Sequence, residues 1–356
     1  MKNKFRIFKQ VPRLIFGINS IKRIEELIPE IDLESEYILI VFDIYFEYKI
    51  PEILNEFDKE IIFFDSKKSE PQTTQINQYR DQILKSRQKK IPKLIIAIGG
   101  GSSMDVGKSL SILFTNDKNA EDYQGWDLVE KKGVYKIGIP SIAGSGSEAS
   151  RTAVLTSNNK KMGINSDYSM FDSIILDPKL LKTVPKDQFI YSAMDCYIHC
   201  VESLEGTYIN DLSRTYAESA LKLCTDALNS DNPNLSKLLT ASYLGGVSIV
   251  NSEVGICHAL SYGLSLEYSY RHGIANCIIF NHLEKYYKSH VVVFKKILKR
   301  HNINLPERLS NDFSHEKINS MVDTALKMER PLENAFGENW RNIFSRKEIE
   351  LIYKKL

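Results

Sequence analysis

The sequence is poor in the features that mark secreted, membrane-spanning or nucleic-acid-binding proteins. Its five cysteines are an odd number and lie between residues 196 and 277 of a 356-residue chain, which argues against the disulfide framework of a secreted protein. No stretch approaches about 18 consecutive apolar residues, the length that spans a membrane. The 47 Lys and Arg residues are matched by 45 Asp and Glu residues, so the charge gives no reason to expect nucleic acid or a membrane as a partner.

The N-terminal segment lacks the apolar run and the small-residue cleavage site of a signal peptide, and we expect a cytoplasmic protein. Cys196 and Cys200 are four residues apart, a spacing that a thiolate metal site can use. No second cysteine pair at zinc-site spacing accompanies them. We interpret them as small buried residues.

The chain has enough apolar material for two domains of ordinary size, because 43% of its residues are hydrophobic. In the first half, continuous apolar runs alternate with helix-like segments such as residues 75–88. The runs predict buried strands at residues 37–42, 61–64, 94–98 and 135–139. This alternation favours a Rossmann-like parallel sheet with helices between its strands.

Helical periodicity dominates from about Pro178 onward. It predicts helices over residues 188–204, 212–228 and 234–266 and through the C-terminal third, with a turn at residues 229–234. We therefore predict an α/β domain over residues 1–178 and an all-helical domain over residues 179–356.

A glycine-rich turn, GGGSSMD at residues 99–105, follows the predicted strand at 94–98. Glycines there permit a tight turn and close approach of a ligand to the backbone. We expect a helix to begin near Ser103, and its free N–H groups and dipole suit a pyrophosphate. The motif has the spacing neither of the usual dinucleotide fingerprint nor of a P-loop, and a plain strand-to-helix turn is the alternative.

Two weaker signals accompany this turn. Asp43 comes directly after the strand at 37–42, where a carboxylate can bind an adenosine ribose and repel a 2′-phosphate; a helix cap is the alternative. The small-residue run PSIAGSGSEAS at residues 140–150 also follows a strand. Its hydroxyls and backbone can line a phosphate or nicotinamide site, and a flexible loop is the alternative.

One carboxylate and three imidazoles form a candidate metal site. Asp195 and His199 are four residues apart in a helical segment, so they project from one face. His258 and His272 follow later in the chain. This donor set suits Zn²⁺ or Fe²⁺ and leaves room for a substrate oxygen, although each histidine taken singly is more often a structural residue.

Four motifs resemble those of the iron-containing (group III) alcohol dehydrogenases, in the family's order and over nearly the whole chain. They are GGGSSMD (99–105), PSIAGSGSE (140–148), MDCYIHCVES (194–203) and CHALSYGLSLEYSYRHG (257–273). The resemblance implies a Rossmann-like domain followed by a helical domain, which is the dehydroquinate synthase-like fold. It also implies a divalent metal, NAD(P) and a homodimer.

Transferred by position, the family's metal ligands fall on Asp195, His199, His258 and His272, the last two with the family's spacing of fourteen. The resemblance implies that cofactor-binding residues are Asp43, Gly100, Gly101, Ser102, Asp105, Ser141, Ser145 and Lys161. Asp43 favours NAD over NADP.

The chain departs from the family at two places. Many members have a further histidine four residues after the third ligand, implicated in proton handling, and here that position is Tyr262. The family's Asn-Pro appears as Glu70-Pro71. Both departures indicate a specialised branch.

YQGWDL (123–128), EASRTAVLTS (148–157), INSDYSMFD (164–172) and MDCYIHCVESLEGT (194–207) resemble a branch that oxidises the C8 alcohol of a sugar acid, 3-deoxy-D-manno-octulosonate. The aldehyde product leads to an 8-amino sugar of lipopolysaccharide.

That resemblance implies a small carboxylate-bearing substrate, for which Arg151, Lys161 and Arg271 are candidate binding cations because each flanks a motif of the expected active site. Tyr262 or a water chain would carry the proton. The branch leaves open whether oxygen or NAD(P) is the final acceptor. A general alcohol dehydrogenase or aldehyde reductase, a dehydroquinate synthase-like lyase and a non-catalytic metal or nucleotide sensor remain alternatives.

Overall fold

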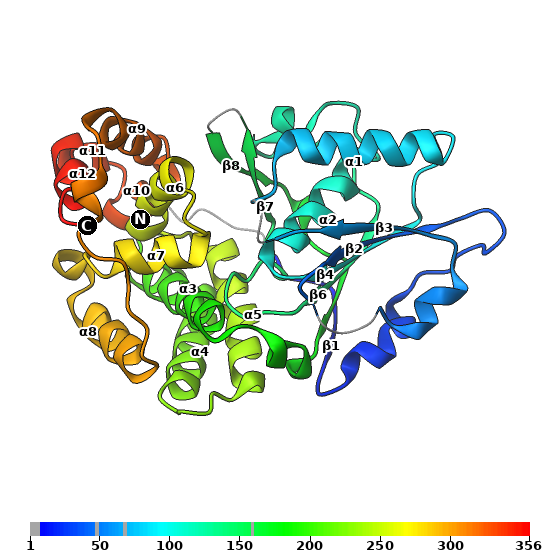
Figure 1. Ribbon diagram of the computed structural model, residues 1–356, viewed down its shortest axis with the longest axis horizontal. Helices are drawn as coiled ribbons and strands as arrows, with labels where there is room; N and C mark the ends of the chain where they lie inside the picture. The colour runs from blue at the N-terminus through cyan, green and yellow to red at the C-terminus, as the bar shows by residue number, and fades with distance from the viewer. Residues whose placement is uncertain (1–7, 47–49, 67–69, 158–159) are drawn as a thin grey trace. The chain divides into compact units, whose positions relative to one another are not determined.

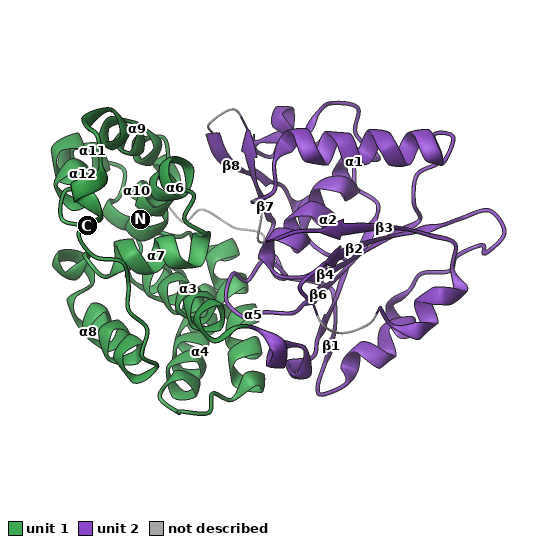
Figure 2. Ribbon diagram, viewed as in Figure 1, with its two compact units in different colours: residues 1–8, 185–356 green, residues 9–184 purple. Residues whose placement is uncertain are grey.

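A computed structural model describes residues 8–46, 50–66, 70–157 and 160–356. The chain divides into two compact units, Lys9–Val184 and Pro185–Leu356 with Phe8 (Figure 2). The division falls between Val184 and Pro185, directly after the 3-10 helix η5 (Pro178–Thr183), which begins where the helical periodicity was expected to start.

The described part of the first unit is built on a parallel six-stranded sheet with the order β1-β9-β6-β4-β2-β3. Four of its strands confirm the apolar runs, namely β2 (Ile38–Asp43), β3 (Lys59–Phe64), β4 (Leu94–Gly99) and β6 (Tyr135–Pro140). The strands β1 (Arg13–Phe16) and β9 (Ser173–Leu176) were not predicted. Each has four residues, too few for a clear period, and β1 is largely exposed.

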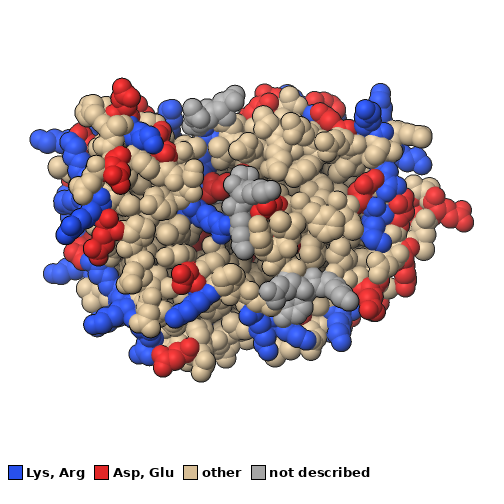
Figure 3. Space-filling model, viewed as in Figure 1, with Lys and Arg blue, Asp and Glu red and all other residues tan. Residues whose placement is uncertain are grey.

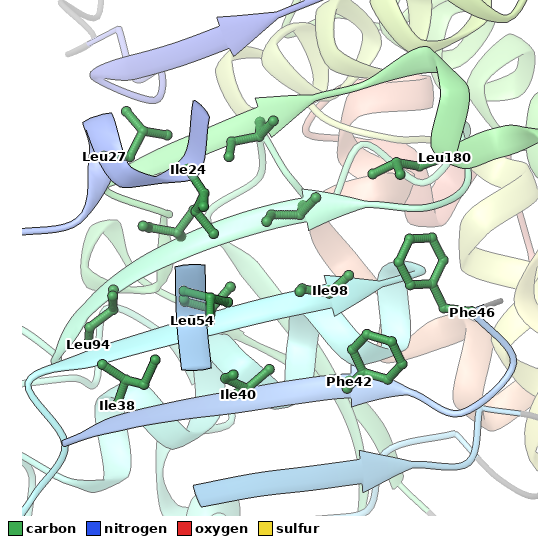
Figure 4. Packing of buried hydrophobic residues seen from close by; sticks show 14 residues of the cluster. Ile24, Leu27, Ile38, Ile40, Phe42, Phe46, Leu54, Leu94, Ile98 and Leu180 are labelled. Atoms are coloured by element: carbon green, nitrogen blue, oxygen red, sulfur yellow. The ribbon is translucent and has the colours of Figure 1, made fainter. Parts of the chain in front are cut away.

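The two faces of this sheet are covered differently. On one face, alternate residues of β2, β4 and β6 pack against the 3-10 helices η1 (Ser20–Leu27) and η2 (Glu52–Glu56) in a single apolar cluster (Figure 4). On the other face lie α1 (Thr73–Ser86) and α2 (Gly101–Leu113) (Figure 1). A Cβ at Gly107 of α2 would lie 2.7 Å from the Cβ of Ala97 in β4, so this glycine lets the helix lie close on the sheet.

Helix α2 begins two residues earlier than expected. Its first helical residue is Gly101, not Ser103, because the turn out of β4 is completed by Gly99 and Gly100. Gly99 has φ +154°, a conformation that L side chains rarely adopt. The glycines therefore shorten the turn and bring the N-terminus of α2 close to the end of β4.

A smaller sheet with the order β5-β8-β7 extends the first unit. It consists of β5 (Gly125–Trp126), β7 (Thr152–Ser157) and β8 (Lys160–Asn165), with β7 and β8 antiparallel. The short 3-10 helices η3 (Ala120–Tyr123) and η4 (Asp167–Ser169) flank it in the chain. These strands are short and only partly buried, which explains why no continuous apolar run predicted them.

The second unit is helical throughout its described length. It contains α3 (Lys186–Glu205), α4 (Asp211–Leu228), α5 (Leu235–Asn251), α6 (Ile256–Tyr268), α7 (His272–Phe280), α8 (Glu284–Arg300), η6 (Leu309–Asp312), α9 (His315–Leu326), α10 (Glu329–Phe336), α11 (Trp340–Ile343) and α12 (Arg346–Tyr353). The expected turn lies between α4 and α5. The fold class predicted from the sequence, a parallel α/β domain followed by a helical domain, is confirmed.

The helix predicted over residues 234–266 is wrong as a single element. It is two helices, α5 and α6, separated at Ser252–Gly255, where Ser252 has φ −130° and ψ −113°. A Cβ at Gly255 would lie 2.9 Å from the hydroxyl of Tyr287 and 3.1 Å from Oε1 of Glu202. This close approach sets the start of α6, and it places His258 in the first turn of that helix.

Basic and acidic side chains are interspersed over the surface in view in Figure 3. Among the described residues, no helix combines the length and the apolar character needed to cross a bilayer.

Candidate metal centre and dinucleotide site

The four proposed metal ligands meet in the helical unit. Asp195 and His199 lie one turn apart on α3, His258 lies near the start of α6, and His272 is the first residue of α7. One ligand atom from each lies within 4.8 Å of the other three. Oδ1 of Asp195 is 3.7 Å from Nε2 of His199, 3.4 Å from that of His258 and 3.7 Å from that of His272.

The donor set fits a divalent transition metal. A carboxylate oxygen and three imidazole nitrogens converge where Asp195, His199 and His258 are at most 3% exposed. Such a mixed set suits Zn²⁺ or Fe²⁺ and provides three or four protein ligands. The rings of His199 and His258 stack with centroids 4.6 Å apart, which restricts their orientations.

The electrostatics of the cluster also favour a cation. Burial raises the pKa of the Asp195 carboxyl, but His199, His272 and His258 outweigh burial and hold that pKa well below its usual range. Burial lowers the pKa of His258, yet the carboxylates of Glu202 and Asp195 raise it to about 9. The protein thus surrounds these imidazoles with negative charge, which a bound divalent cation would neutralise.

Glu202 is a site residue that sequence reasoning missed. Its Oε2 lies 2.5 Å from Nδ1 of His258, and its Oε1 accepts a hydrogen bond of 2.5 Å from the backbone N–H of Cys257. A carboxylate on Nδ1 leaves Nε2 of the same ring for a metal. The available signal was its position on α3, three residues after His199, which places both on one helix face.

Asn276 is a second site residue that sequence reasoning missed, and the candidate proton carrier Tyr262 lies near it. Nδ2 of Asn276, on α7, donates to Oδ1 of Asp195 at 2.6 Å and lies 3.1 Å and 3.2 Å from Nε2 of His258 and of His272. This amide therefore orients the carboxylate. The ring of Tyr262, one turn after His258 on α6, meets the ring of His272 edge-on with centroids 5.8 Å apart.

The glycine turn and the second small-residue run lie side by side in the α/β unit. A Cβ at Gly101 would lie 2.9 Å from Oγ of Ser145, and the N–H of Ser141 donates to the carbonyl of Gly99 at 2.8 Å. The first residues of α2, Gly101 and Ser102, therefore adjoin the run that contains Ser141 and Ser145. Free N–H groups at such a helix N-terminus suit a phosphate.

Asp43 ends β2 beside this turn. Its Oδ2 is 3.5 Å from Oγ of Ser103, and its Oδ1 accepts from the N–H of Tyr45 at 3.1 Å. A Cβ at Gly99 would lie 2.8 Å from Cβ of Asp43. The carboxylate is thus next to the start of α2, at the carboxyl end of the parallel sheet, where open α/β sheets bind ligands.

Asp105 and Lys108 of α2 point into the protein. Oδ1 of Asp105 accepts from Oγ of Ser147 at 2.8 Å, and its Oδ2 accepts from the N–H of Val154 at 3.1 Å. Burial raises the pKa of Asp105 to about 6 and lowers that of Lys108 to about 8. Nζ of Lys108 donates to Oγ of Ser147 and to Oγ of Ser150, both at 3.0 Å. Both side chains are thus buried charged groups bound to residues 147–154, which lead from the second small-residue run into β7.

The three candidate substrate cations have different surroundings. Arg151 pairs with Asp127 and with Asp167, the latter at 3.1 Å. Lys161 is 5% exposed and pairs with Glu70 at 2.6 Å. Arg271 precedes His272 and donates to the neutral amide of Gln188 at 3.0 Å.

The cysteines beside the metal ligands are free and buried, as interpreted from the sequence.

Family models match both units of the chain. Residues 12–178 match the family described as iron-containing alcohol dehydrogenase, and residues 189–311 match the C-terminal model of the same family. The chain belongs to the iron-containing alcohol dehydrogenase family.

Two curated relatives show how far the similarity extends. The long-chain-alcohol dehydrogenase 1 of Geobacillus thermodenitrificans is 31% identical over 202 residues, which cover 54% of this chain and 51% of that protein. The NAD-dependent methanol dehydrogenase of Bacillus methanolicus is 26% identical over 285 residues, 76% of this chain and 73% of that protein. The chain thus spans about half of the first relative.

Solved structures of an alcohol dehydrogenase and of a reductase share the fold. An alcohol dehydrogenase from Oenococcus oeni superposes with a TM-score of 0.82 at 19% identity and covers 98% of this chain and 99% of that one. A sulfoacetaldehyde reductase from Bifidobacterium kashiwanohense, in complex with NAD⁺, has a TM-score of 0.79 at 18% identity and covers 99% and 98%.

Proposed function

We propose that this iron-containing alcohol dehydrogenase family member is a metal-dependent, NAD(P)-dependent oxidoreductase that interconverts a primary alcohol and its aldehyde. The convergence of one carboxylate and three imidazoles within 4.8 Å carries the proposal. Membership of the iron-containing alcohol dehydrogenase family also supports the proposal, since family models match both units of the chain.

Asp195, His199, His258 and His272 would hold the metal. A divalent metal supplies Lewis acidity, which polarises a substrate oxygen and eases its deprotonation. Glu202 holds the ring of His258 through Nδ1, and Asn276 orients Asp195 through its amide. The chain itself contributes fixed orientation and a dry, buried environment.

The dinucleotide would bind at the glycine turn. When bound, nicotinamide supplies the hydride acceptor or donor. The N-terminus of α2 would bind the pyrophosphate through backbone N–H groups, with Ser141 and Ser145 beside it. Asp43 stands where a ribose hydroxyl would be recognised and a 2′-phosphate repelled, so we propose NAD as the preferred nucleotide.

For the substrate, we propose the C8 alcohol of 3-deoxy-D-manno-octulosonate, oxidised to the aldehyde. The branch-typical segments support this choice, and the small sheet gathers three of them around Trp126, Arg151 and Asp167. Among the candidate cations, Arg271 adjoins the proposed ligand His272, and we propose that it faces the substrate carboxylate. Tyr262, beside the ring of His272, is our proposed proton carrier.

The decisive experiment is to incubate purified protein with 3-deoxy-D-manno-octulosonate, with and without NAD⁺, NADP⁺ and oxygen, and to identify the product by mass spectrometry. An aldehyde two mass units lighter supports the proposal. Turnover of ethanol or butanol with an inert sugar acid would establish a general alcohol dehydrogenase instead.

A second candidate activity is reduction of a small anionic aldehyde. It is favoured by a sulfoacetaldehyde reductase of Bilophila wadsworthia, which is 31% identical over 190 residues. Sulfoacetaldehyde with NADH belongs in the same assay. Product without net NADH change would indicate a lyase, and nucleotide binding without any turnover would indicate a sensor.

A further inference from the structure

A buried amide on α10 holds the loop of residues 252–255, which joins α5 to α6. Nδ2 of Asn334 donates to the carbonyls of Glu253 and Val254, both at 3.0 Å. Asn334 is 0% exposed, so these bonds are shielded from water. Two successive carbonyls that share one buried donor confine the loop to one position relative to α10.

The same side chain reaches the end of α3. Its Nδ2 lies 3.4 Å from the carbonyl of Glu202, and its Oδ1 accepts from the N–H of Tyr208 at 2.8 Å. A Cβ at Gly206 would overlap both polar atoms of the amide, so this glycine makes room for it. Asn334 thus sets loop 252–255 against the last turn of α3.

These two segments carry the residues that meet behind the metal centre. Glu202 lies on α3, and its Oε2 is 2.5 Å from Nδ1 of His258, which follows the loop by three residues. Its Oε1 accepts from the N–H of Cys257 at 2.5 Å. A shift of the loop would therefore move His258 relative to the carboxylate that fixes its ring.

A second side chain of α10 supports the same loop. Arg330 lies one turn before Asn334, and its Nε is 3.3 Å from Oε2 of the partly buried Glu253. Oε1 of this carboxylate accepts from the N–H of Val254 at 3.1 Å. Helix α10 also packs against α6 (Figure 1). It therefore contacts both the loop and the helix that carries His258.

We infer that Asn334 and Arg330 are positioning residues for the metal centre, acting by holding loop 252–255 so that His258 meets Glu202. The inference rests on the proposed function, which places the metal on His258. Helix α10 lies after residue 311, where the match to the C-terminal family model ends. Without the amide of Asn334, two loop carbonyls lose a buried donor, and the start of α6 can shift.

Asn334→Ala tests the inference and leaves all four proposed ligands in place. We expect the Kd for Zn²⁺, from titration of metal-free protein against a chromogenic chelator, to rise about tenfold, as for a group that orients a ligand. When saturated with Co²⁺, the variant should show shifted visible absorption bands, because these depend on the geometry of the ligands. A loss of stability alone would leave the spectrum of the saturated protein unchanged.

Asn116→Ala is the matched control in the α/β unit. Asn116 is 5% exposed, and its amide also holds a loop, since Nδ2 donates to the carbonyl of Lys131 at 3.0 Å and Oδ1 accepts from the N–H of the same residue at 2.9 Å. This variant should keep the Zn²⁺ affinity and the Co²⁺ spectrum of the wild type. Equal Zn²⁺ affinities in all three proteins, or equal losses in both variants, would overturn the inference.

Arg330→Met decides the question where Asn334→Ala does not fold. It removes the ion pair with Glu253 and keeps the amide, so the Kd for Zn²⁺ should rise about two- to fivefold, the size of a partly exposed ion pair. Wild-type Zn²⁺ affinity in this variant would also overturn the inference.

Hydrogen exchange of the metal-free proteins separates the inference from the proposed function. The backbone amides of residues 254–258 should exchange faster in Asn334→Ala than in the wild type or in Asn116→Ala. Unchanged exchange there would refute the anchoring of the loop by α10, whatever the protein binds. A wild type that binds no Zn²⁺ would instead refute the metal-dependent part of the proposed function, and the inference with it.

Discussion

Replacing Glu202 with glutamine should loosen the metal site without removing any ligand. The carboxylate is fully buried, with one oxygen 2.5 Å from Nδ1 of His258 and the other 2.5 Å from the N–H of Cys257. Both neighbours present hydrogens to it. A glutamine amide offers one oxygen and one NH₂ group, so one of the two donors must face another donor.

The magnitude follows from that single lost bond. A hydrogen bond to a charged group contributes about 1.5–3 kcal/mol, and loss of a carboxylate behind a ligating histidine typically weakens metal affinity about 10- to 100-fold. The two figures agree, since each factor of ten is about 1.4 kcal/mol. We therefore expect Glu202→Gln to raise the metal Kd by one to two orders of magnitude.

The assay is a competitive titration of metal-free protein with Zn²⁺ or Fe²⁺ against a chromogenic chelator, with circular dichroism to verify the fold. Glu205→Gln is the control, because Glu205 ends the same helix and its 53%-exposed carboxylate pairs with His290 at 3.2 Å, a surface pair of small energy. Wild-type metal affinity in Glu202→Gln would refute the orienting role of this carboxylate.

Three further predictions concern the other parts of the site. Gly101→Val places side-chain atoms against Oγ of Ser145, which would lie 2.9 Å from the new Cβ. Calorimetry should then show that NAD⁺ binding is lost, and elemental analysis should show an unchanged metal content. Intact NAD⁺ binding would refute the proposed location of the anion site. Tyr262→Phe keeps the ring beside His272 and removes the hydroxyl, so kcat should fall about 10²-fold at constant metal content if the tyrosine carries a proton, and an unchanged pH–rate profile would contradict that role. NAD⁺ affinity should be highest between the pKa values of Asp105, about 6, and Lys108, about 8, because below the first Ser147 loses a charged acceptor and above the second it loses a charged donor. The free energy of unfolding should follow the opposite trend and be lowest between these two pKa values. The raised pKa of Asp105 contributes stability that is lost as the pH rises through about 6. The lowered pKa of Lys108 contributes stability that is lost as the pH falls through about 8. Calorimetric Kd values and unfolding curves from pH 5 to pH 9 check both signs. A flat binding profile would contradict the dependence of NAD⁺ binding on the charges of Asp105 and Lys108. The other charges beside this pair are Glu70, Lys136 and Glu148.

The central strands were predictable because they are buried on both faces. β2 and β4 have no exposed residue, so their sequences are continuous apolar runs that no amphipathic element would show. The edge strand β1 carries Arg13 and exposed side chains. Its pairing with β9 is a long-range contact, and nothing local in four residues indicates it.

The break between α5 and α6 was missed for a related reason. The apolar period continues on both sides of Ser252–Gly255 and led to the prediction of one helix, although the low helix propensity of Gly255 was a local signal against it. The break is set by what Gly255 meets in the folded unit, namely the hydroxyl of Tyr287 and the carboxylate of Glu202. A residue 53 positions away in sequence thus decides where α6 starts, and the start of α6 positions His258.

The ligands were proposed from donor type, from spacing and from the resemblance to the family's motifs, whereas the residues that orient them were not predicted. Asn276 and Lys108 have no ligand chemistry of their own that the sequence reveals, and each acts through contacts that only the fold creates. Lys108 in particular looks like an ordinary helical lysine, yet it is fully buried. A lysine on an otherwise apolar or small-residue helix face, three residues after an aspartate, is the local signal that was available.

Helix α3 carries an orienting residue directly beside two of the proposed metal ligands. Asp195, His199 and Glu202 occupy positions i, i+4 and i+7 of one helix, so all three project from the same face. The first two face the metal centre directly and the third reaches it through His258 on another helix. One face of one helix therefore carries both ligands and the carboxylate that orients a third. Glu202 is 1% exposed, and a charged side chain buried to that extent has few stable roles other than a paired one. Nδ1 of His258, on a later helix, provides that partner.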